Sequence, residues 1–208
     1  MLGLEYDTPG DWASHALADP AALLLDHLFC ERKAAAMALS LLATPVGDRP
    51  GVGALLRALA NEEIEHAERV ERLLAERTAP RQARGGNPYA QGLRRAIHAG
   101  GHDRSLDLLI VSSLIEARSA ERFQLLASEL RGSTLGGFYE DLWASEVGHY
   151  RLFVELAVGA FGESTALARL AELRRCEAAL VRGLLPGPRI HSGPPAGHES
   201  PRRGGRVP

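Results

Sequence analysis

The chain has 208 residues, of which 45% are hydrophobic and 24% charged, and its 24 basic and 26 acidic side chains leave a formal charge of −2. At ~150 residues per domain this length predicts one domain, or one domain with a tail, and the composition is that of a globular protein rather than a disordered chain. Two cysteines without a CxxC pair exclude a disulfide framework and a cysteine zinc site, and favour a reducing compartment.

Neither a secretion signal nor a membrane span is expected. The amino-terminal region carries Glu5 and Asp7 in place of the basic residues of a secretion signal. The longest predominantly apolar run, residues 34–43, is well short of the ~20 residues that span a bilayer. We therefore expect a cytoplasmic protein that does not enter a membrane.

The first half of the chain predicts two long helices joined by a short connection. The first begins at Pro20, with Asp19 as its expected N-cap, and continues to about residue 44. Proline and glycine in residues 45–51 end it. A second helix is expected over about residues 52–77, because apolar side chains recur there every three or four positions.

The second half predicts a short helix near residues 89–99 and then three long ones. The first of these begins near Asp103, its expected N-cap, and continues to residue 130. The others are expected over residues 134–160 and 163–184. No stretch of the sequence has the pattern of a strand, so the predicted class is all-α.

After Leu185 the composition changes to proline, glycine, serine, histidine and arginine. Such a segment buries too little apolar surface to order itself. The sequence therefore predicts a domain over residues 1–185 and a disordered tail over residues 186–208 with a net charge of +3. A solvated terminus is the ordinary interpretation of this tail, and contact with RNA is the alternative.

Each of the four longest predicted helices has one glutamate within its apolar stripe. The four are Glu31, Glu63, Glu116 and Glu146. Burying an unpaired carboxylate is costly enough that such groups are normally neutralised or bind a cation. Two of them are followed three residues later by a histidine, His66 and His149, which places both side chains on the same helix face.

The spacing of these glutamates predicts that they meet at one level of a bundle. Glu31 lies 13 residues before the end of its helix and Glu63 lies 12 residues after the next helix begins, so at ~1.5 Å per residue their heights match. Glu116 and Glu146 lie 14 and 13 residues from the turn between their helices. Each half is thus an antiparallel hairpin with the pattern Glu, then Glu-x-x-His.

Together the two hairpins supply the ligand pattern of the di-iron or di-manganese site of ferritin-like bundles. Four carboxylates balance two divalent cations when both imidazoles are neutral, and oxygen ligands with two imidazoles suit Fe(II) or Mn(II). We predict a ferritin-like four-helix bundle with a di-iron carboxylate core and flanking helices. The alternative is a bundle whose glutamates face inward for structural reasons.

A basic segment lies between residues 77 and 104, where six arginines face a single aspartate and the net charge is +5. Tyrosine and histidine are interleaved with these arginines, as in surfaces that contact nucleic acid. The candidate RNA-binding residues are Arg81, Arg84, Arg94 and Arg95. An arginine-rich, solvated loop is the alternative.

Several strings resemble the tRNA hydroxylase family of MiaE type. They are LDHLFCERKAA at residues 25–35, EEIEH at 62–66, IEARSAERF at 115–123 and SEVGH at 145–149. The resemblance covers about residues 5–182. Asn61, Ala67 and Ala120 depart from the residues usual in the family, and none of the three is a candidate ligand.

This resemblance implies a nonhaem di-iron monooxygenase that uses O2 to hydroxylate the isopentenyl group of 2-methylthio-N6-isopentenyladenosine, next to the anticodon of tRNA. The six glutamates and histidines would hold two iron ions and be the catalytic residues, and the anticodon stem-loop would be the partner of a monomer or dimer. Electrons would come from an external reductase or ferredoxin-type donor, because the chain has no dinucleotide fingerprint or iron–sulfur cysteine set.

Two other functions fit the same ligand pattern. One is a ferritin-like iron-binding or ferroxidase storage protein, against which the basic segment at residues 77–104 argues. The other is a di-iron oxygenase that acts on a small hydrophobic molecule.

Overall fold

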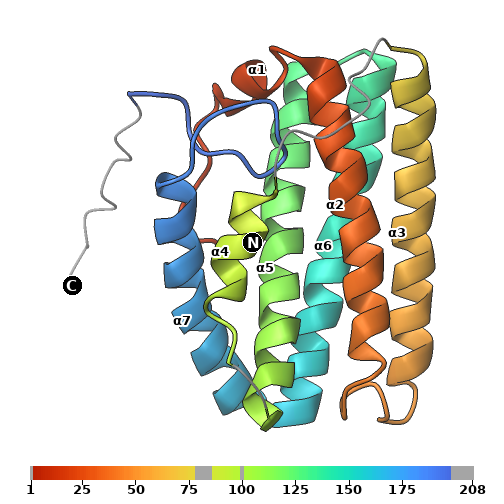
Figure 1. Ribbon diagram of the computed structural model, residues 1–208, viewed down its shortest axis with the longest axis vertical. Helices are drawn as coiled ribbons and strands as arrows, with labels where there is room; N and C mark the ends of the chain where they lie inside the picture. Colours follow the sequence, from red (N-terminus) through yellow and green to blue (C-terminus); the bar gives the residue numbers. More distant parts are fainter. Residues whose placement is uncertain (1, 78–85, 99–100, 198–208) are drawn as a thin grey trace.

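The computed structural model describes residues 2–77, 86–98 and 101–197, and in these ranges it consists of helices and loops without strands (Figure 1). The helices are α1 (Trp12–Ala16), α2 (Pro20–Leu41), α3 (Val52–Ala75), α4 (Pro88–Arg94), α5 (Gly101–Glu129), α6 (Thr134–Phe161) and α7 (Glu163–Arg182). Within the described ranges, no helix is both long and apolar enough to cross a membrane.

Four long helices form two antiparallel hairpins, α2 with α3 and α5 with α6, which stand side by side (Figure 1). α7 packs against α5 and α6, and α4 lies between α5 and α7. The predicted four-helix bundle with flanking helices is therefore confirmed. α1 was not predicted, and α5 begins two residues before the expected Asp103.

The expected cap at Asp19 is formed, whereas Asp103, the other expected cap, lies inside α5. Asp19 Oδ1 accepts a hydrogen bond of 3.0 Å from the backbone N–H of Ala22 at the start of α2. Between α5 and α6, Gly132 has a φ of +82°, a conformation that side chains with a Cβ rarely adopt. Ser133 Oγ then accepts from Gly136 N at 3.0 Å and begins α6. These local signals set the lengths of the helices and hence the level at which the four glutamates stand.

Two apolar clusters make up the core, one toward each end of the bundle. One includes Leu56, Leu109 and Phe153, and the other includes Leu24 and Phe123. Along each long helix the chain passes from one cluster to the other, and the buried glutamate of that helix lies between them. A polar layer therefore crosses the middle of the bundle, closed above and below by apolar side chains.

The prediction that residues 186–208 are disordered is wrong for residues 186–197, which we call the C-terminal strap. Ile190, His191 and Ser192 are buried. The strap returns from the end of α7 across the bundle (Figure 1), where the backbone N–H of Ile190 donates to Asp26 Oδ2 at 3.0 Å. Residues 198–208 lie outside the described part of the chain.

Long-range hydrogen bonds order the strap, and composition does not reveal them. Arg122 donates to the carbonyl oxygen of Ile190. Trp12 Nε1 donates to Ser192 Oγ at 3.0 Å. Because both donors are buried, each would lose a partner if the strap detached, at a cost of about 1–3 kcal/mol per unsatisfied group.

Candidate metal centre

Six side chains meet in the polar layer, and they are the six that the sequence singled out. They are Glu31 from α2, Glu63 and His66 from α3, Glu116 from α5, and Glu146 and His149 from α6. None is more than 5% exposed. The matched heights of the two hairpins and the three-residue spacing within each Glu-x-x-His pair bring all six to one site.

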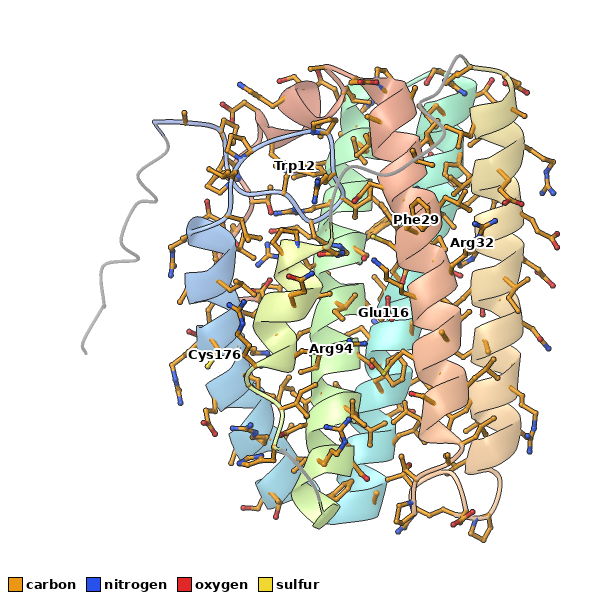
Figure 2. All side chains as sticks on the ribbon, in the orientation of Figure 1. Trp12, Phe29, Arg32, Arg94, Glu116 and Cys176 are labelled. Atoms are coloured by element: carbon orange, nitrogen blue, oxygen red, sulfur yellow. The ribbon has the colours of Figure 1, made fainter. Side chains whose placement is uncertain are left out.

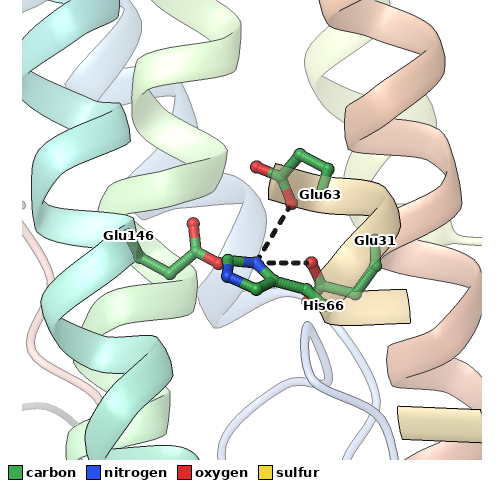
Figure 3. Close-up of side chains that lie close together, drawn as sticks. All are labelled: Glu31, Glu63, His66 and Glu146. Carbon is green, nitrogen blue, oxygen red and sulfur yellow. Dashed lines mark ion pairs between the residues drawn. The ribbon is translucent and has the colours of Figure 1, made fainter. Parts of the chain in front are cut away.

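The six side chains form two overlapping groups. The first comprises Glu31, Glu63, His66 and Glu146 (Figure 3), and the second comprises Glu63, Glu116, Glu146 and His149. Within each group, one ligand atom from every residue lies within 4.8 Å of the others. Glu63 and Glu146 belong to both groups. The two groups, each of which could hold a cation, thus have two carboxylates in common.

In both Glu-x-x-His pairs the Nδ1 atom of the imidazole lies close to carboxylate oxygens. His66 Nδ1 lies 3.6 Å from Glu31 Oε2 and 3.6 Å from Glu63 Oε2. His149 Nδ1 lies 2.9 Å from Glu63 Oε1 and 3.4 Å from Glu146 Oε2. The two ring centroids are 5.9 Å apart. Each ring thus points one nitrogen at the space that the carboxylates surround.

In the absence of cations, the raised pKa values of several side chains favour bound protons in this layer. Burial raises the pKa of Glu63 to about 8, with the charge of Glu146 adding to the effect, and burial with the same neighbour raises the pKa of Glu116 well above its usual range. Burial alone would lower the pKa of each imidazole, but contacts with carboxylates outweigh it and raise the pKa of His66 to about 10 and of His149 to about 12. Cations would therefore displace protons from this layer.

Several buried polar atoms of the site have no hydrogen-bond partner among the described residues. They are both carboxylate oxygens of Glu63, Oε2 of Glu146, Nδ1 of His66 and both ring nitrogens of His149. Leaving a buried polar group unsatisfied costs about 1–3 kcal/mol, so such atoms are uncommon in native cores. Here they surround one space, and oxygen with imidazole nitrogen is a donor set that suits Fe(II) or Mn(II). The residues present fit a pair of divalent ions.

His27, which the sequence analysis does not include among the ligands, supports Glu31. Its side chain is fully buried, and Nε2 lies 2.5 Å from Glu31 Oε1, to which an ionised carboxylate requires it to donate. Burial alone would raise the pKa of Glu31, but His27 and its hydrogen bond outweigh this effect and lower the pKa. The spacing of four residues on one helix could have revealed the pair.

Glu62 links the site to the surface between α3 and α6. Its side chain is 47% exposed, and Oε2 lies 3.2 Å from His149 Nε2, an ion-pair distance without the alignment of a hydrogen bond. Ser145 Oγ donates to the other carboxylate oxygen of Glu62. Sequence reasoning missed this residue because the neighbouring Glu63 accounts for the motif.

Asp26 and Asp107 precede Glu31 and Glu116 on their helices, and both bind groups other than the ligand imidazoles. Asp26 accepts from Ile190 of the C-terminal strap. Asp107 accepts from Arg169 at 2.7 Å and from the backbone of His98 at 2.7 Å. Helix periodicity places such a residue on a face but does not identify its partner on another element.

The candidate RNA-binding arginines are only partly within the described chain. Arg94, labelled in Figure 2, and Arg95 are exposed at the end of α4. Arg81 and Arg84 lie outside the described residues. The basic surface therefore stays a prediction.

Comparison with known proteins finds a matching family, two similar relatives and a similar solved structure. The family model for MiaE, described as tRNA-(ms2io6A)-hydroxylase, matches residues 2–192. A Pseudomonas putida protein named tRNA 2-(methylsulfanyl)-N(6)-isopentenyladenosine(37) hydroxylase is 41% identical over 189 residues, which cover 90% of this chain and 91% of the relative. A Salmonella typhimurium protein of the same name is 30% identical over 242 residues, covering 93% of this chain and 88% of the relative.

A solved structure from Synechococcus, described as protein 43 with aldehyde deformylating oxygenase activity, has a TM-score of 0.85 and 36% sequence identity to this chain. The match covers 92% of this chain and 96% of that one. The fold is thus the ferritin-like four-helix bundle that the sequence predicts.

Proposed function

The chain belongs to the MiaE family of tRNA hydroxylases, and from this premise we propose that it hydroxylates the isopentenyl group of 2-methylthio-N6-isopentenyladenosine in tRNA as an O2-dependent, nonhaem di-iron monooxygenase. The observation that carries this proposal is the buried layer of four carboxylates and two imidazoles, whose unsatisfied atoms surround one space. We expect the reaction to take place in the cytoplasm, where its tRNA substrate is.

We assign the six side chains to two iron ions. Glu31 and His66 would hold one ion, Glu116 and His149 would hold the other, and Glu63 and Glu146 would be shared, as their membership of both groups suggests. His27, which contacts Glu31 from the same helix, would keep Glu31 ionised and oriented. Four carboxylate charges then balance two divalent ions.

When bound, the two iron ions supply the activation of O2 and the insertion of one oxygen atom into an allylic C–H bond. The second oxygen atom leaves as water, so each turnover needs two electrons and two protons from outside the substrate. The protein contributes the orientation of the ligands and the exclusion of water by the apolar clusters on either side of the layer. An external reductase or ferredoxin-type donor would supply the electrons.

A second candidate is oxygenation of a free aliphatic molecule. The aldehyde deformylating oxygenase activity named for the Synechococcus protein favours it, because that protein is 36% identical to this chain. Iron storage, the remaining alternative, requires a cage of many subunits, whereas we expect a monomer or dimer by light scattering.

Nucleoside analysis tests the proposed function. Protein loaded with Fe(II) and supplied with a reductase, a ferredoxin-type donor and 18O2 should convert prenylated tRNA into a product that carries one labelled hydroxyl group. The same tRNA without the prenyl group is the control. Conversion of an aldehyde with no change in the RNA would favour the second candidate, and iron oxidation without any oxygenated product would indicate a ferroxidase.

Iron uptake should release protons and stabilise the fold. Near neutral pH the metal-free site holds protons on His66 and His149 and on Glu63, whose pKa values are raised to about 10, 12 and 8, and two cations must displace them. The apparent affinity for Fe(II) is therefore expected to rise as the pH rises toward 8. Calorimetric titrations in buffers of different protonation enthalpy would measure the proton release.

The same binding should raise the melting temperature by mass action, because the unfolded chain has no assembled site. Thermal unfolding with and without Fe(II) would measure this shift. A melting temperature that does not change with Fe(II), or an affinity that does not depend on pH, would contradict a buried site assembled in the folded protein.

Neutralising four arginines should weaken RNA binding without loss of iron. We expect the variant with Arg81, Arg84, Arg94 and Arg95 replaced by glutamine to bind a prenylated anticodon stem-loop more weakly. If each arginine contacts one phosphate, the slope of log affinity against log salt should flatten by about 3. Titrations at several salt concentrations would measure it, with Arg131, exposed on the connection between α5 and α6, replaced as a control. An unchanged slope would mean that RNA approaches another surface.

A further inference from the structure

A pocket opens beside Glu116, between α2, α4, α5 and the C-terminal strap. The space that these elements surround, including the open solvent at its mouth, is about 440 Å³. Ala34 and Met37 of α2 and Ile115 of α5 contribute an apolar lining. The pocket thus joins the protein surface to one of the carboxylates of the metal centre, through walls that suit a hydrocarbon.

Ser112 gives this apolar pocket a buried polar atom without a partner. The residue is 2% exposed, and its Oγ has no hydrogen-bond partner among the described residues. It lies four residues before Glu116 on α5, so both side chains share a helix face and both line the pocket. A buried hydroxyl of this kind is expected to be satisfied by a polar group of a bound molecule.

His191 of the C-terminal strap forms another wall of the pocket, where its Nδ1 lies 3.8 Å from Cys30 Sγ of α2. Its ring stacks on that of Tyr89, with centroids 4.5 Å apart and an interplanar angle of 5°, and its Nε2 is hydrogen-bonded to Ser119 Oγ at 3.2 Å. Burial, with the nearby charge of Arg122, lowers the pKa of His191 well below its usual range. The ring is therefore neutral near pH 7 and presents an uncharged wall to the pocket.

We propose that this pocket receives the aliphatic chain of the substrate, with Ser112 as a hydrogen-bond partner of the alcohol that the reaction creates and His191 as the wall that limits chain length. The inference rests on the function proposed above and deepens it, because it assigns the residues that position the isopentenyl group next to Glu116.

Binding measurements on iron-loaded protein test the pocket without relying on turnover. Three anticodon stem-loops that differ only at one adenosine would be compared, namely unmodified, prenylated and hydroxyprenylated. Burying each CH2 group contributes about a fourfold gain in affinity, so wild-type protein should bind the prenylated RNA at least about tenfold more tightly than the unmodified RNA. Ala34→Leu, which fills the pocket, should abolish this preference.

Matched variants distinguish a change in the pocket from a general effect of the substitution on folding or RNA binding. Ala36→Leu is the same substitution on an exposed position of the same helix and should keep the preference. Ser112→Ala should weaken binding of the hydroxyprenylated RNA about fivefold or more, as expected for a lost hydrogen bond of about 1 kcal/mol, and leave the prenylated RNA unaffected. Iron content and melting temperature would confirm that each variant is folded.

His191→Ala keeps the proposal testable if Ala34→Leu does not fold. Removing this wall should let the protein bind a stem-loop that bears a longer, ten-carbon prenyl chain, which the wild type should reject. Failure of His191→Ala to accept the longer chain, or persistence of the prenyl preference in folded Ala34→Leu, would overturn the assignment of the pocket.

The outcomes also distinguish the pocket from the proposed function. If wild-type protein hydroxylates prenylated tRNA and Ala34→Leu still binds prenylated RNA more tightly than unmodified RNA, the assignment of the pocket is wrong and the proposed function is supported. If wild-type protein neither prefers nor hydroxylates prenylated RNA, the function fails and the prenyl assignment fails with it. Binding of a free aliphatic aldehyde that is lost in Ala34→Leu would then identify a free hydrocarbon as the occupant.

Discussion

Replacing Glu63 by alanine is expected to abolish the binding of both iron ions, whereas replacing Glu31 by alanine should leave one. Glu63 belongs to both ligand groups and Glu31 to only one. His149→Ala should also leave one ion and so abolish the paired site, because His149 belongs to only one group. Iron analysis and Mössbauer spectroscopy would measure the number of ions and their coupling. In Glu63→Ala the rate of hydroxylation should fall by more than the ~10–100-fold typical of losing a residue that only supports a ligand.

Glu65 provides the matched control for these variants. It lies on the same helix, two residues from Glu63, and is exposed. Glu65→Ala should therefore keep two coupled iron ions and the wild-type rate. Two coupled ions in both Glu63→Ala and His149→Ala would show that the ligand assignment is wrong.

Glu177→Ala is expected to lower the free energy of unfolding by about 3 kcal/mol, the lower end of the range for breaking a buried ion pair, because it removes the buried partner of Arg118 and leaves it only the partly buried Glu121. Neither side chain is exposed, and Arg118 Nε and Nη2 donate to the two carboxylate oxygens of Glu177 at 2.8 and 2.9 Å. Burial alone would lower the pKa of Arg118, but Glu177 outweighs this effect and raises it, so the guanidinium stays charged. Denaturant unfolding would measure the loss.

The pair Arg169 and Glu172 is the control for this prediction. Arg169 Nη1 lies 2.7 Å from Glu172 Oε2, and Glu172 is 55% exposed. Because water solvates the charge that remains, Glu172→Ala should lower the free energy of unfolding far less than Glu177→Ala does. Replacing both Arg118 and Glu177 by methionine should recover much of the loss, since no buried charge is then left unpaired. A loss in Glu177→Ala as small as that in Glu172→Ala would contradict the predicted role of the buried ion pair.

Glu177 also contacts a residue that supports a wall of the pocket. Tyr89 donates its hydroxyl hydrogen to Glu177 Oε1 at 3.0 Å, and the ring of Tyr89 supports that of His191. The buried ion pair therefore contacts α4 directly and supports the His191 ring of the C-terminal strap through Tyr89. This contact joins α5, α7 and the wall of the pocket.

The sequence by itself determined the helices and the level of the polar layer. Caps such as Asp19 and Ser133 bond to a residue three positions away, and apolar side chains recur every three or four positions. Both patterns can therefore be recognised in the sequence. Because a helix rises by a constant amount per residue, the distances of Glu31 and Glu63 from the turn between them predict that they meet. The Glu-x-x-His spacing predicts the place of each imidazole for the same reason.

Only the tertiary structure decided which carboxylates are shared and how the site is supported. That Glu63 and Glu146 belong to both groups depends on how the two hairpins face one another, which spacing along one helix does not specify. The contact of Glu62 with His149 likewise joins α3 to α6. Asp26 lies on α2, but its hydrogen-bond partner, Ile190, comes from the strap.

The C-terminal strap shows the physical reason for this division. Its composition is that of a disordered segment, yet Ile190 bonds to a residue 164 positions away and Ser192 to one 180 positions away. Such contacts stabilise a segment only after the bundle has formed and presents buried donors and acceptors to it. Local sequence determines what a segment can form alone, whereas the order of the strap, and with it one wall of the pocket, depends on partners that only the folded bundle supplies.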